Sequence, residues 1–288
     1  MAEFVIKDED LVSLKNKVVI VTGGSSGIGL ATVKLLLSLG ASVVSGDLTE
    51  PVESPTSAFL FVKSDVASWR DLSALFKKAK KQYGRIDYVF ANAGVGPRAN
   101  YLAIETDEKG DLIEPNNLVL DVMLKGAMNT ACLGVHYMKQ QPEGGSIVLM
   151  GSSTGLQPLR APDYSTAKHG VLGFGRGYAR LMEVAGLPIR INTLMPSWTT
   201  TNLLPDLPGL MKGAKHQSQP GLVVARAAAY LMVDVSRQGD VVFVCDGKYT
   251  EIEKTILWPA YEKVKGAGNP SDDEILKRML ELPAPAAQ

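Results

Sequence analysis

Short apolar runs alternate with longer helical patterns along most of this chain, from about residue 16 to residue 245. The runs are rich in β-branched residues, and stretches such as VVIV are continuous instead of alternating with polar residues. Such runs are typical of strands that are buried on both faces. They predict seven strands, at Lys17–Thr22, Ser42–Asp47, Phe59–Lys63, Tyr88–Ala91, Ser146–Met150, Arg190–Leu194 and Asp240–Cys245.

The segments between these runs carry apolar residues at helical spacing. They predict helices at Ile28–Leu39, Ser68–Tyr83, Asn117–Lys139, Tyr164–Ala185 and Leu222–Val235. Because strands and helices alternate, the expected fold class is α/β, with one doubly wound parallel sheet of seven strands and helices on both of its faces.

Two stretches break the alternation. Residues 197–220 are polar and rich in Pro and Gly, which predicts a mobile loop over a site. Residues 246–288 end in LPAPAAQ, which predicts an irregular tail with one helix near Asp273–Leu282. We therefore expect an N-terminal extension over 1–15, a central domain over 16–247 that includes the loop, and a C-terminal extension over 248–288.

Composition and charge narrow the class of protein. Hydrophobic residues make up 45% of the chain and charged residues 21%, which excludes a disordered or fibrous protein. Thirty basic residues balance thirty acidic ones, so we expect neither nucleic acid nor a membrane surface as partner. Two cysteines, Cys132 and Cys245, are too few for a disulfide framework or a zinc cluster, and the isolated His136 and His216 suggest no metal site.

The N-terminal residues lack the basic start and apolar core of a signal peptide, and no apolar run is expected to approach the ~18–20 residues that span a bilayer. The sequence therefore predicts a cytoplasmic protein in a reducing compartment.

A glycine-rich turn follows the first strand, where KVVIVT continues as GGSSGIG before a helical pattern. Glycine at positions 23, 27 and 29 lets the backbone turn tightly and approach a pyrophosphate closely. The free amides at the start of the following helix then bind the phosphates. Together with the acid that ends the next strand, Asp47, this pattern predicts a dinucleotide site in a Rossmann-type domain.

Asp47 also indicates which dinucleotide is bound. A carboxylate at this position can accept hydrogen bonds from both adenosine ribose hydroxyls, and it repels a 2′-phosphate. No Arg or Lys lies between Gly40 and Val62 to neutralise such a phosphate. We therefore expect NAD, not NADP, as the cofactor.

Five motifs in order resemble those of the short-chain dehydrogenase/reductase family over residues 16 to about 245. Thr22-Gly23 with Gly27 and Gly29 is similar to its TGxxxGxG turn, Asp65-Val66 to its adenine-flanking pair, and Asn92-Ala93-Gly94 to its NAG segment. Tyr164 to Lys168 is similar to its YxxxK motif, and Pro196 to Thr201 to its PGxxxT loop. Within the family, YSTAKHGVLGF and YMKQQPEGGSIVLMGSSTG most resemble 15-hydroxyprostaglandin dehydrogenases and fungal-type alcohol dehydrogenases.

The resemblance implies that the central domain binds NAD and contains the catalytic residues. It also implies that the protein forms a homodimer or a homotetramer. The residues that it implies for cofactor binding lie in these motifs; they are Gly23, Ser25, Ser26, Gly27, Ile28, Gly29, Asp47, Asp65, Val66, Asn92, Ala93, Gly94, Tyr164, Lys168, Pro196, Thr199 and Thr201.

Tyr164 and Lys168 are the expected catalytic pair, and Ser152 is expected to hold the substrate oxygen. The tyrosine and the lysine are four residues apart, so their side chains share one face of a helix. A phenol with an ordinary pKa near 10 is a poor base at neutral pH, but a neighbouring ammonium favours its ionised form. Lys168 is thus expected to lower the pKa of Tyr164 and to bind the nicotinamide ribose. The family places its serine three residues before a glycine, which selects Ser152 before Gly155, with Ser153 as the alternative.

The chain departs from the family in two places. Met123 stands where the family has an asparagine that holds a water beside the lysine, and methionine cannot donate a hydrogen bond. Ser197 replaces the glycine that follows the proline of the PGxxxT loop. Met123 leaves open whether the proton relay is rebuilt by another group, turnover is slower, or the active site has drifted.

The three expected substrate loops, at 94–101, 155–163 and 197–222, are mostly apolar, with Arg98, Arg160 and Lys212 as scattered charges. Their apolar residues are Val95, Pro97, Tyr101, Leu156, Pro158, Leu159, Trp198, Leu203, Leu204, Leu207, Leu210 and Met211. This set favours a lipophilic secondary alcohol or ketone over a sugar or a small acid, and we expect a substrate of specialised metabolism. Two alternatives stay open: a cofactor-binding protein with little catalysis, and an NADPH-dependent biosynthetic ketoreductase.

Overall fold

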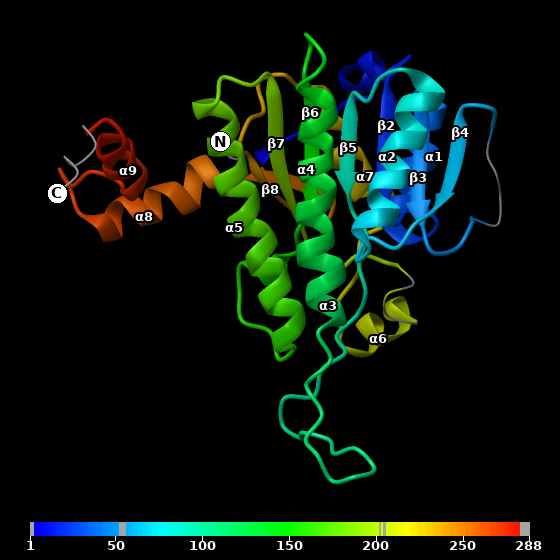
Figure 1. Ribbon diagram of the computed structural model, residues 1–288, viewed down its shortest axis with the longest axis vertical. Helices are drawn as coiled ribbons and strands as arrows, with labels where there is room; N and C mark the ends of the chain where they lie inside the picture. The colour runs from blue at the N-terminus through cyan, green and yellow to red at the C-terminus, as the bar shows by residue number, and fades with distance from the viewer. Residues whose placement is uncertain (1–2, 52–55, 202, 204–205, 283–288) are drawn as a thin grey trace, which may run out of the picture.

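The computed structural model describes residues 3–51, 56–201, 203 and 206–282. Its strands form one nine-stranded sheet in the order β1-β9-β8-β7-β6-β5-β2-β3-β4 (Figure 1). The strands are β1 (Glu3–Phe4), β2 (Val18–Thr22), β3 (Ser42–Asp47), β4 (Phe59–Lys63), β5 (Tyr88–Ala91), β6 (Gly145–Met150), β7 (Ile189–Pro196), β8 (Val241–Cys245) and β9 (Lys248–Glu251).

The predicted α/β fold class is confirmed, but the predicted number of seven strands is wrong. The seven strands from β2 to β8 pair in parallel, and two further strands add an antiparallel edge. Asp246 and Gly247 both have positive φ, at 50° and 78°, and form a two-residue turn that brings β9 back along β8. Such an Asp-Gly pair after an apolar strand is a hairpin signal, and the prediction overlooked it.

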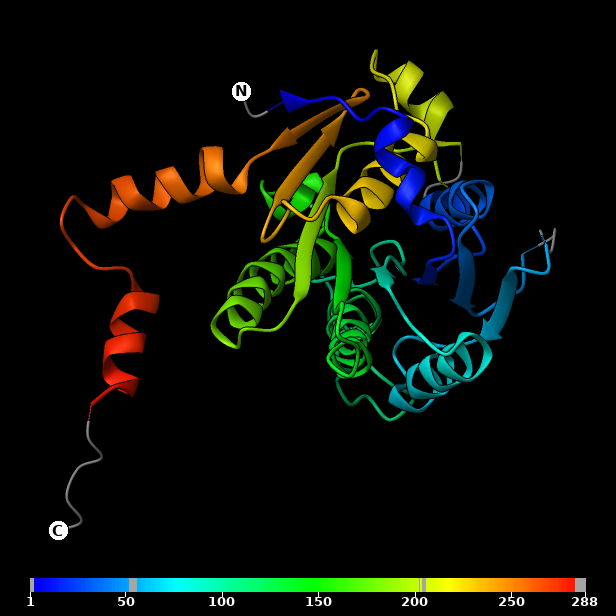
Figure 2. The ribbon, with the colours of Figure 1, turned by 90° about the horizontal axis from the view of Figure 1, so that it is seen from above.

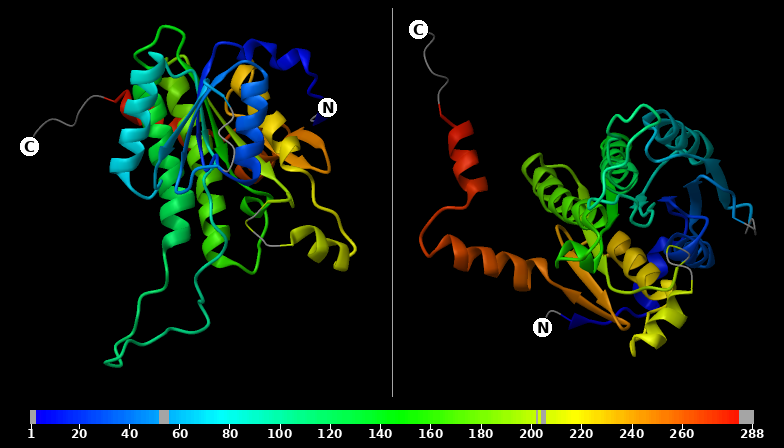
Figure 3. Two further views of the ribbon diagram at one scale, coloured as in Figure 1. Left: turned by 90° about the vertical axis from the view of Figure 1, so that its right-hand side faces the viewer. Right: turned by 90° about the horizontal axis from the view of Figure 1, so that it is seen from below.

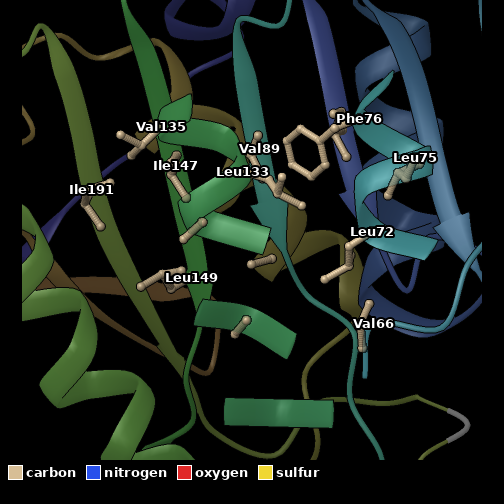
Figure 4. Close-up of a cluster of buried hydrophobic side chains, with 14 of the residues drawn as sticks. Val66, Leu72, Leu75, Phe76, Val89, Leu133, Val135, Ile147, Leu149 and Ile191 are labelled. Carbon is tan, nitrogen blue, oxygen red and sulfur yellow. The ribbon is translucent and has the colours of Figure 1, made fainter. Parts of the chain in front are cut away.

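Helices cover both faces of the sheet. On one face α2, α4 and α5 pack over a core that includes Phe76 and Ile147 (Figure 4), and on the other α1 and α7 pack over Val19 and Phe90. The helices are η1 (Glu9–Leu14), α1 (Gly27–Ser38), α2 (Trp69–Tyr83), α3 (Leu118–Leu120), η2 (Asp121–Lys125), α4 (Gly126–Met138), η3 (Ser153–Gly155), α5 (Pro162–Val184), α6 (Leu207–Gly213), α7 (Gly221–Val233), η4 (Glu253–Leu257), α8 (Trp258–Lys265) and α9 (Asp272–Leu280).

One continuous helix, Leu118–Met138, is formed by α3, η2 and α4. By length and composition alone it is apolar enough to cross a membrane, with a mean hydropathy of 1.4. This corrects the expectation that no apolar run approaches that length. The reason for its apolar composition is its position: it lies over β5 and β6, where Ala131 and Leu133 are buried in the core.

The C-terminal stretch contains more regular structure than the single helix expected there. After β9 it continues as η4, α8 and α9, and α8 and α9 extend away from the sheet (Figure 2). Neither α8 nor α9 has a buried residue, and an ion pair of 2.8 Å joins Asp273 of α9 to Arg180 of α5. Likewise, the expected mobile loop over 197–220 contains the short helix α6.

The direction of winding reverses between β2 and β5. From β2 the chain proceeds to β3 and β4 on one side, whereas β5 to β8 follow on the other. In sheets of this kind a crevice for ligands forms beyond the carboxyl ends of the strands at the point of reversal. The segment between β5 and α3 leaves this edge as a long projecting arm (Figure 3).

Candidate active site

The glycine-rich turn is closely packed backbone. Gly23 has a positive φ of 68° and donates its N–H to Gly46 O at 2.8 Å. A Cβ atom on Gly23 would lie 2.7 Å from Ala93 Cα, and one on Gly29 would lie 1.9 Å from Gly23 O. Because no side chain fits at these positions, the backbone stays bare where α1 begins at Gly27. Such a bare helix start can approach a phosphate closely.

Two neighbouring serines have buried hydroxyls. Ser25 Oγ and Ser45 Oγ have no hydrogen-bond partner among the residues that the structure describes. Buried hydroxyls are normally satisfied, so an orphan in this glycine-rich turn fits a polar ligand. The bare glycines and the orphaned Ser25 hydroxyl therefore fit a dinucleotide. Ser26 is exposed immediately before α1, with Ile28 in its first turn.

Asp47 ends β3 beside this turn. Its carboxylate accepts the Ser25 N–H at 2.9 Å and the Leu48 N–H at 2.7 Å. Two backbone donors therefore fix the carboxylate at the carboxyl end of the strand. It is thereby linked directly to the glycine-rich turn.

The segment after β5 supports the turn from the other side. Asn92 Nδ2 donates to Thr22 O at 3.0 Å and to Gly23 O at 3.1 Å, and the amides of Asn92 and Ala93 donate to Thr22 Oγ1. The side chain of Asn92 is thus used to hold the end of β2, and Gly94 follows as an exposed residue.

The Asp65-Val66 pair, after β4, is also held locally. The Asp65 carboxylate accepts the Ala67 N–H at 2.9 Å, and Val66 is buried. A Cβ atom on Gly126 would lie 3.0 Å from a methyl group of Val66, so the valine packs closely against the start of α4.

The structure brings Ser152, Tyr164 and Lys168 together at the carboxyl end of β6. Ser152 follows this strand, and its hydroxyl hydrogen-bonds to Tyr164. Tyr164 lies in the first turn of α5, and Lys168 lies one turn later with only 2% of its surface exposed. Lys168 Nζ donates to Met150 O at 2.8 Å and lies 5.7 Å from the centre of the Tyr164 ring. Ser153, the alternative serine, lies in η3.

The pKa values of the pair differ from the expectation that Lys168 lowers the pKa of Tyr164. Burial raises the pKa of Tyr164, and the Ser152 hydrogen bond lowers it only in part. Burial also lowers the pKa of Lys168, to about 7. The physical reason is that both groups lie in a region of low dielectric, where the neutral amine and the neutral phenol are favoured.

Met123 lies in η2, a π-helical turn in the middle of the long helix. Its side chain is 3% exposed, and a Cβ atom on Gly94 would lie 2.9 Å from its terminal methyl group. Met123 therefore fills the space beneath the segment after β5. Single π turns occur frequently at functional sites.

The loop after β7 carries the remaining cofactor candidates. Pro196 ends the strand, Thr199 is buried, and Thr201 lies so close to Gly27 that a Cβ atom there would be 3.1 Å from Thr201 Cβ. The loop is held by Gln219, whose Nε2 donates to Thr199 Oγ1 at 3.2 Å and to Val244 O at 2.9 Å. The sequence analysis did not find Gln219, because no local pattern marks it.

A second residue that the sequence analysis missed is Asp163. Its carboxylate is buried and accepts three backbone amides, from Arg98, Ala99 and Tyr164. An acid in the first turn of a helix, after Pro162, is a helix-start signal that could have drawn attention to it.

The apolar side chains expected around the substrate surround the same edge of the sheet. Trp198 and Leu159 are 44% and 42% exposed, whereas Leu207 and Met211 are the buried residues of α6. Leu204 lies outside the described residues. In the described part of the chain, the loops after β6 and β7 thus carry exposed apolar side chains.

Comparison with known proteins agrees with this geometry. The profile of the family described as short chain dehydrogenase matches residues 17–208. The short-chain dehydrogenase/reductase ascJ of Acremonium egyptiacum is 48% identical over 287 residues, which are 98% of this chain and 96% of that protein. Human 15-hydroxyprostaglandin dehydrogenase [NAD(+)] is 32% identical over 209 residues, 67% of this chain and 72% of that protein.

Among solved structures, the 3-ketoacyl-(acyl-carrier-protein) reductase from Brucella melitensis, complexed with NADH, superimposes with a TM-score of 0.68. The identity is 23%, and the match covers 80% of this chain and 96% of that one. The resemblance drawn from the motifs, including that to 15-hydroxyprostaglandin dehydrogenase and fungal relatives, is confirmed. The chain belongs to the short-chain dehydrogenase/reductase family, whose members are oxidoreductases that bind a nicotinamide cofactor.

Proposed function

We propose that this chain is an NAD-dependent dehydrogenase that interconverts a secondary alcohol and a ketone on a lipophilic small molecule. The observation that carries the proposal is the cluster at the end of β6, where the half-buried Tyr164 meets the Ser152 hydroxyl and Lys168 lies one helical turn away. A phenol, a hydroxyl and an amine in this arrangement can hold an alcohol oxygen and remove its proton.

In the proposed mechanism, the Ser152 hydroxyl orients the substrate oxygen, and the ionised oxygen of Tyr164 takes the hydroxyl proton. The bound NAD supplies the acceptor for the hydride that leaves the carbinol carbon, together with a positive charge that favours the ionised phenol. Lys168 has a pKa lowered by burial to about 7, so it can exchange a proton near neutral pH. Its role in binding the nicotinamide ribose is part of the same proposal.

NAD is proposed because of the position of Asp47. Its carboxylate is fixed by the amides of Ser25 and Leu48, and a 2′-phosphate next to it would meet a negative charge. The named cofactor of the human relative, NAD(+), agrees with this assignment. Fluorescence titration tests it: the dissociation constant for NADH should be at least ~10-fold lower than for NADPH. Equal or tighter binding of NADPH would instead favour the alternative of a biosynthetic ketoreductase.

The lipophilic substrate is proposed from the exposed apolar residues in the loops after β6 and β7, among them Leu159, Trp198 and Leu203. The human relative is named for a hydroxylated prostaglandin, which is a lipid. Apolar walls with few polar groups favour ligands of this kind.

A second candidate function, a cofactor-binding protein with little catalysis, is favoured by one observation. Met123 is a buried methionine at the position of the family's water-holding asparagine, and it offers no hydrogen-bond donor. Without that relay a proton would leave Tyr164 more slowly.

A panel of alcohols separates the two functions. The wild-type protein is incubated with NAD and with 2-octanol, cyclohexanol, 1-phenylethanol, sorbitol or lactate, and the absorbance of the reduced nicotinamide is followed. The proposal predicts turnover of the first three and little of the last two. Tight NAD binding without turnover of any alcohol, or of the matching ketones with NADH, would favour the cofactor-binding protein.

A further inference from the structure

The buried carboxylate of Asp163 joins two parts of the active site that are far apart in the sequence. Oδ2 accepts the N–H groups of Arg98 at 2.7 Å and Ala99 at 3.0 Å, whereas Oδ1 accepts the N–H of Tyr164 at 2.7 Å. The residue is 2% exposed. One side chain therefore holds both the segment after β5 and the residue that carries the catalytic phenol.

These amides also determine the charge of Asp163. Burial raises the pKa of the carboxyl group. The hydrogen bonds from the amides of Arg98, Ala99 and Tyr164 lower it by more, so the net pKa lies below the usual value. The group is therefore an ionised carboxylate at neutral pH. Hydrogen bonds from backbone amides to an ionised acceptor are stronger than those between neutral groups.

The segment that Asp163 holds forms a wall of the site. It begins at Asn92, which is bonded to the glycine-rich turn. At Gly94 the segment passes over Met123. At Gly96 it runs beside the loop after β7, where a Cβ atom placed on Gly96 would lie 3.7 Å from Leu203 O. At Ala99 it reaches Asp163. The segment thus connects the cofactor turn, the loop after β7 and the start of α5.

Beyond Ala99 the chain makes the arm that projects from the body (Figure 3). Every residue from 100 to 114 is exposed, and the next buried residue is Val119 in α3. The arm has an isolated bridge between Thr106 and Leu112, and none of its residues is buried in the core. The bonds to Asp163 are therefore the last buried attachment of the wall before a long solvent-exposed stretch.

We propose that Asp163 is a positioning residue that fixes the wall Gly94–Ala99 relative to the phenol of Tyr164. This inference rests on the proposed dehydrogenase function and adds a determinant of substrate binding to it. Because the two oxygens of one carboxylate hold the two partners, the wall and the phenol keep a constant separation. A substrate held against this wall then presents its hydroxyl to Tyr164.

Asp163→Asn removes this double attachment. A carboxamide has one acceptor oxygen, so either the Tyr164 amide or the Arg98 and Ala99 amides face a donor instead. With 2-octanol as the probe and saturating NAD, we expect KM to rise about tenfold and kcat to fall less than threefold, since the reacting groups remain. The dissociation constant for NAD should stay within about twofold of wild type, because the glycine-rich turn is not altered.

Asp163→Ser is measured beside it. Serine is shorter and has one acceptor oxygen, so it cannot hold both partners, but it is well tolerated at the start of a helix. The serine variant replaces the asparagine variant in the test if the latter does not fold. We expect it to raise KM by a similar factor. Hydrogen exchange of the amides at 94–101 should become faster in both variants.

Asp87→Asn is the matched control. Asp87 is also a buried carboxylate that accepts a backbone amide, that of Val18 at 2.8 Å, but it lies at the amino end of β5, across the sheet from the site. This variant should lose stability without a rise in KM or faster exchange at 94–101.

The outcomes separate the positioning role from the proposed function. If the wild type turns over 2-octanol and the Asp163 variants keep its KM, the positioning role is overturned and the dehydrogenase function stands. The same holds if Asp87→Asn raises KM equally, since the effect would then reflect general loss of stability. If the wild type oxidises no alcohol of the panel, the proposed function fails and the positioning role fails with it.

Discussion

The glycine-rich turn and the loops on the substrate side both lie at the carboxyl ends of the sheet, but different groups hold them in place. In the turn, backbone packs directly on backbone, and a Cβ atom on Gly29 would overlap Gly23 O at 1.9 Å. On the substrate side, two buried polar side chains fasten the loops: Asp163 holds the segment after β5, and Gln219 holds the loop after β7.

This difference determines which of the two regions can change its sequence without losing its shape. A region fixed by backbone contact has no room for a larger residue, and it therefore keeps one shape for one cofactor. A loop fixed by a single side chain can change its length and composition beyond that point, and here the stretch beyond it, 100–114, is exposed. Loops carried on a rigid scaffold are where binding specificity commonly resides.

Among the variants that test how the two regions are held, Gly29→Ala should have the largest effect, because it disturbs the packing of the glycine-rich turn. The new methyl group would overlap Gly23 O, so the turn must shift. We expect NAD binding to weaken by ~100-fold or more and stability to fall by about 2–3 kcal/mol, as overpacked sites do. Fluorescence titration and urea unfolding measure both.

Gly177→Ala provides the control for this substitution. Gly177 lies in α5, and a Cβ atom there would meet nothing within 4 Å. Alanine in an open helical position should stabilise the protein by about 0.5–1 kcal/mol and leave NAD binding unchanged. Equal NAD affinity in the Gly29→Ala variant and the wild type would contradict the account of the turn.

An intermediate effect is expected from Lys168→Met, which tests whether the amine of Lys168 is buried in the folded protein. Burial lowers the pKa of Lys168 from its ordinary value of 10.5 to about 7 in the folded protein, so the unfolded chain binds more protons between these two pH values. The free energy of unfolding of the wild type should therefore rise with pH from about 7 upward, by about 2–3 kcal/mol between pH 7 and 9.

The variant lacks this group, so it should be the more stable protein at pH 6 and lose its advantage by pH 9. Urea unfolding at pH 6, 7.5 and 9 measures the difference. Parallel stability profiles of the two proteins would show that the amine of Lys168 is not buried in this way.

The smallest effect is expected from Gln219→Met, which tests whether Gln219 holds the loop after β7 in place. Methionine keeps the volume but removes the bonds to Thr199 and Val244, which should cost about 2 kcal/mol of stability. The loop after β7 should loosen, and KM for 2-octanol should rise roughly fivefold. Gln217→Met, two residues earlier and exposed, is the control. Identical KM values for both variants would show that Gln219 does not fix the loop.

The fold was predictable where the signal is local. All seven predicted strands are present, because parallel strands that are buried on both faces are continuous apolar runs. The two edge strands were missed: β1 has two residues, and β9 has the mostly polar sequence KYTE after a turn whose Asp-Gly signal was overlooked. The helix α6 was missed because Pro and Gly mask its short pattern.

The site divides in the same way. The turn and the Tyr164–Lys168 pair are visible in the sequence because their residues are neighbours on the chain. The two anchoring residues are not visible, because Asp163 bonds to Arg98, 65 residues away, and Gln219 to Val244, 25 residues away. Nor could the sequence show that burial changes the pKa values of both members of the pair.

Tyr164→Phe tests the central claim most directly, because it removes one oxygen atom and leaves the cofactor turn intact. With 2-octanol and saturating NAD, kcat should fall by roughly 10³-fold, as expected when a proton-transferring group is lost. The dissociation constant for NAD should remain within about twofold of the wild-type value. A variant that retains a tenth or more of the wild-type kcat would show that the phenol of Tyr164 does not carry the proton.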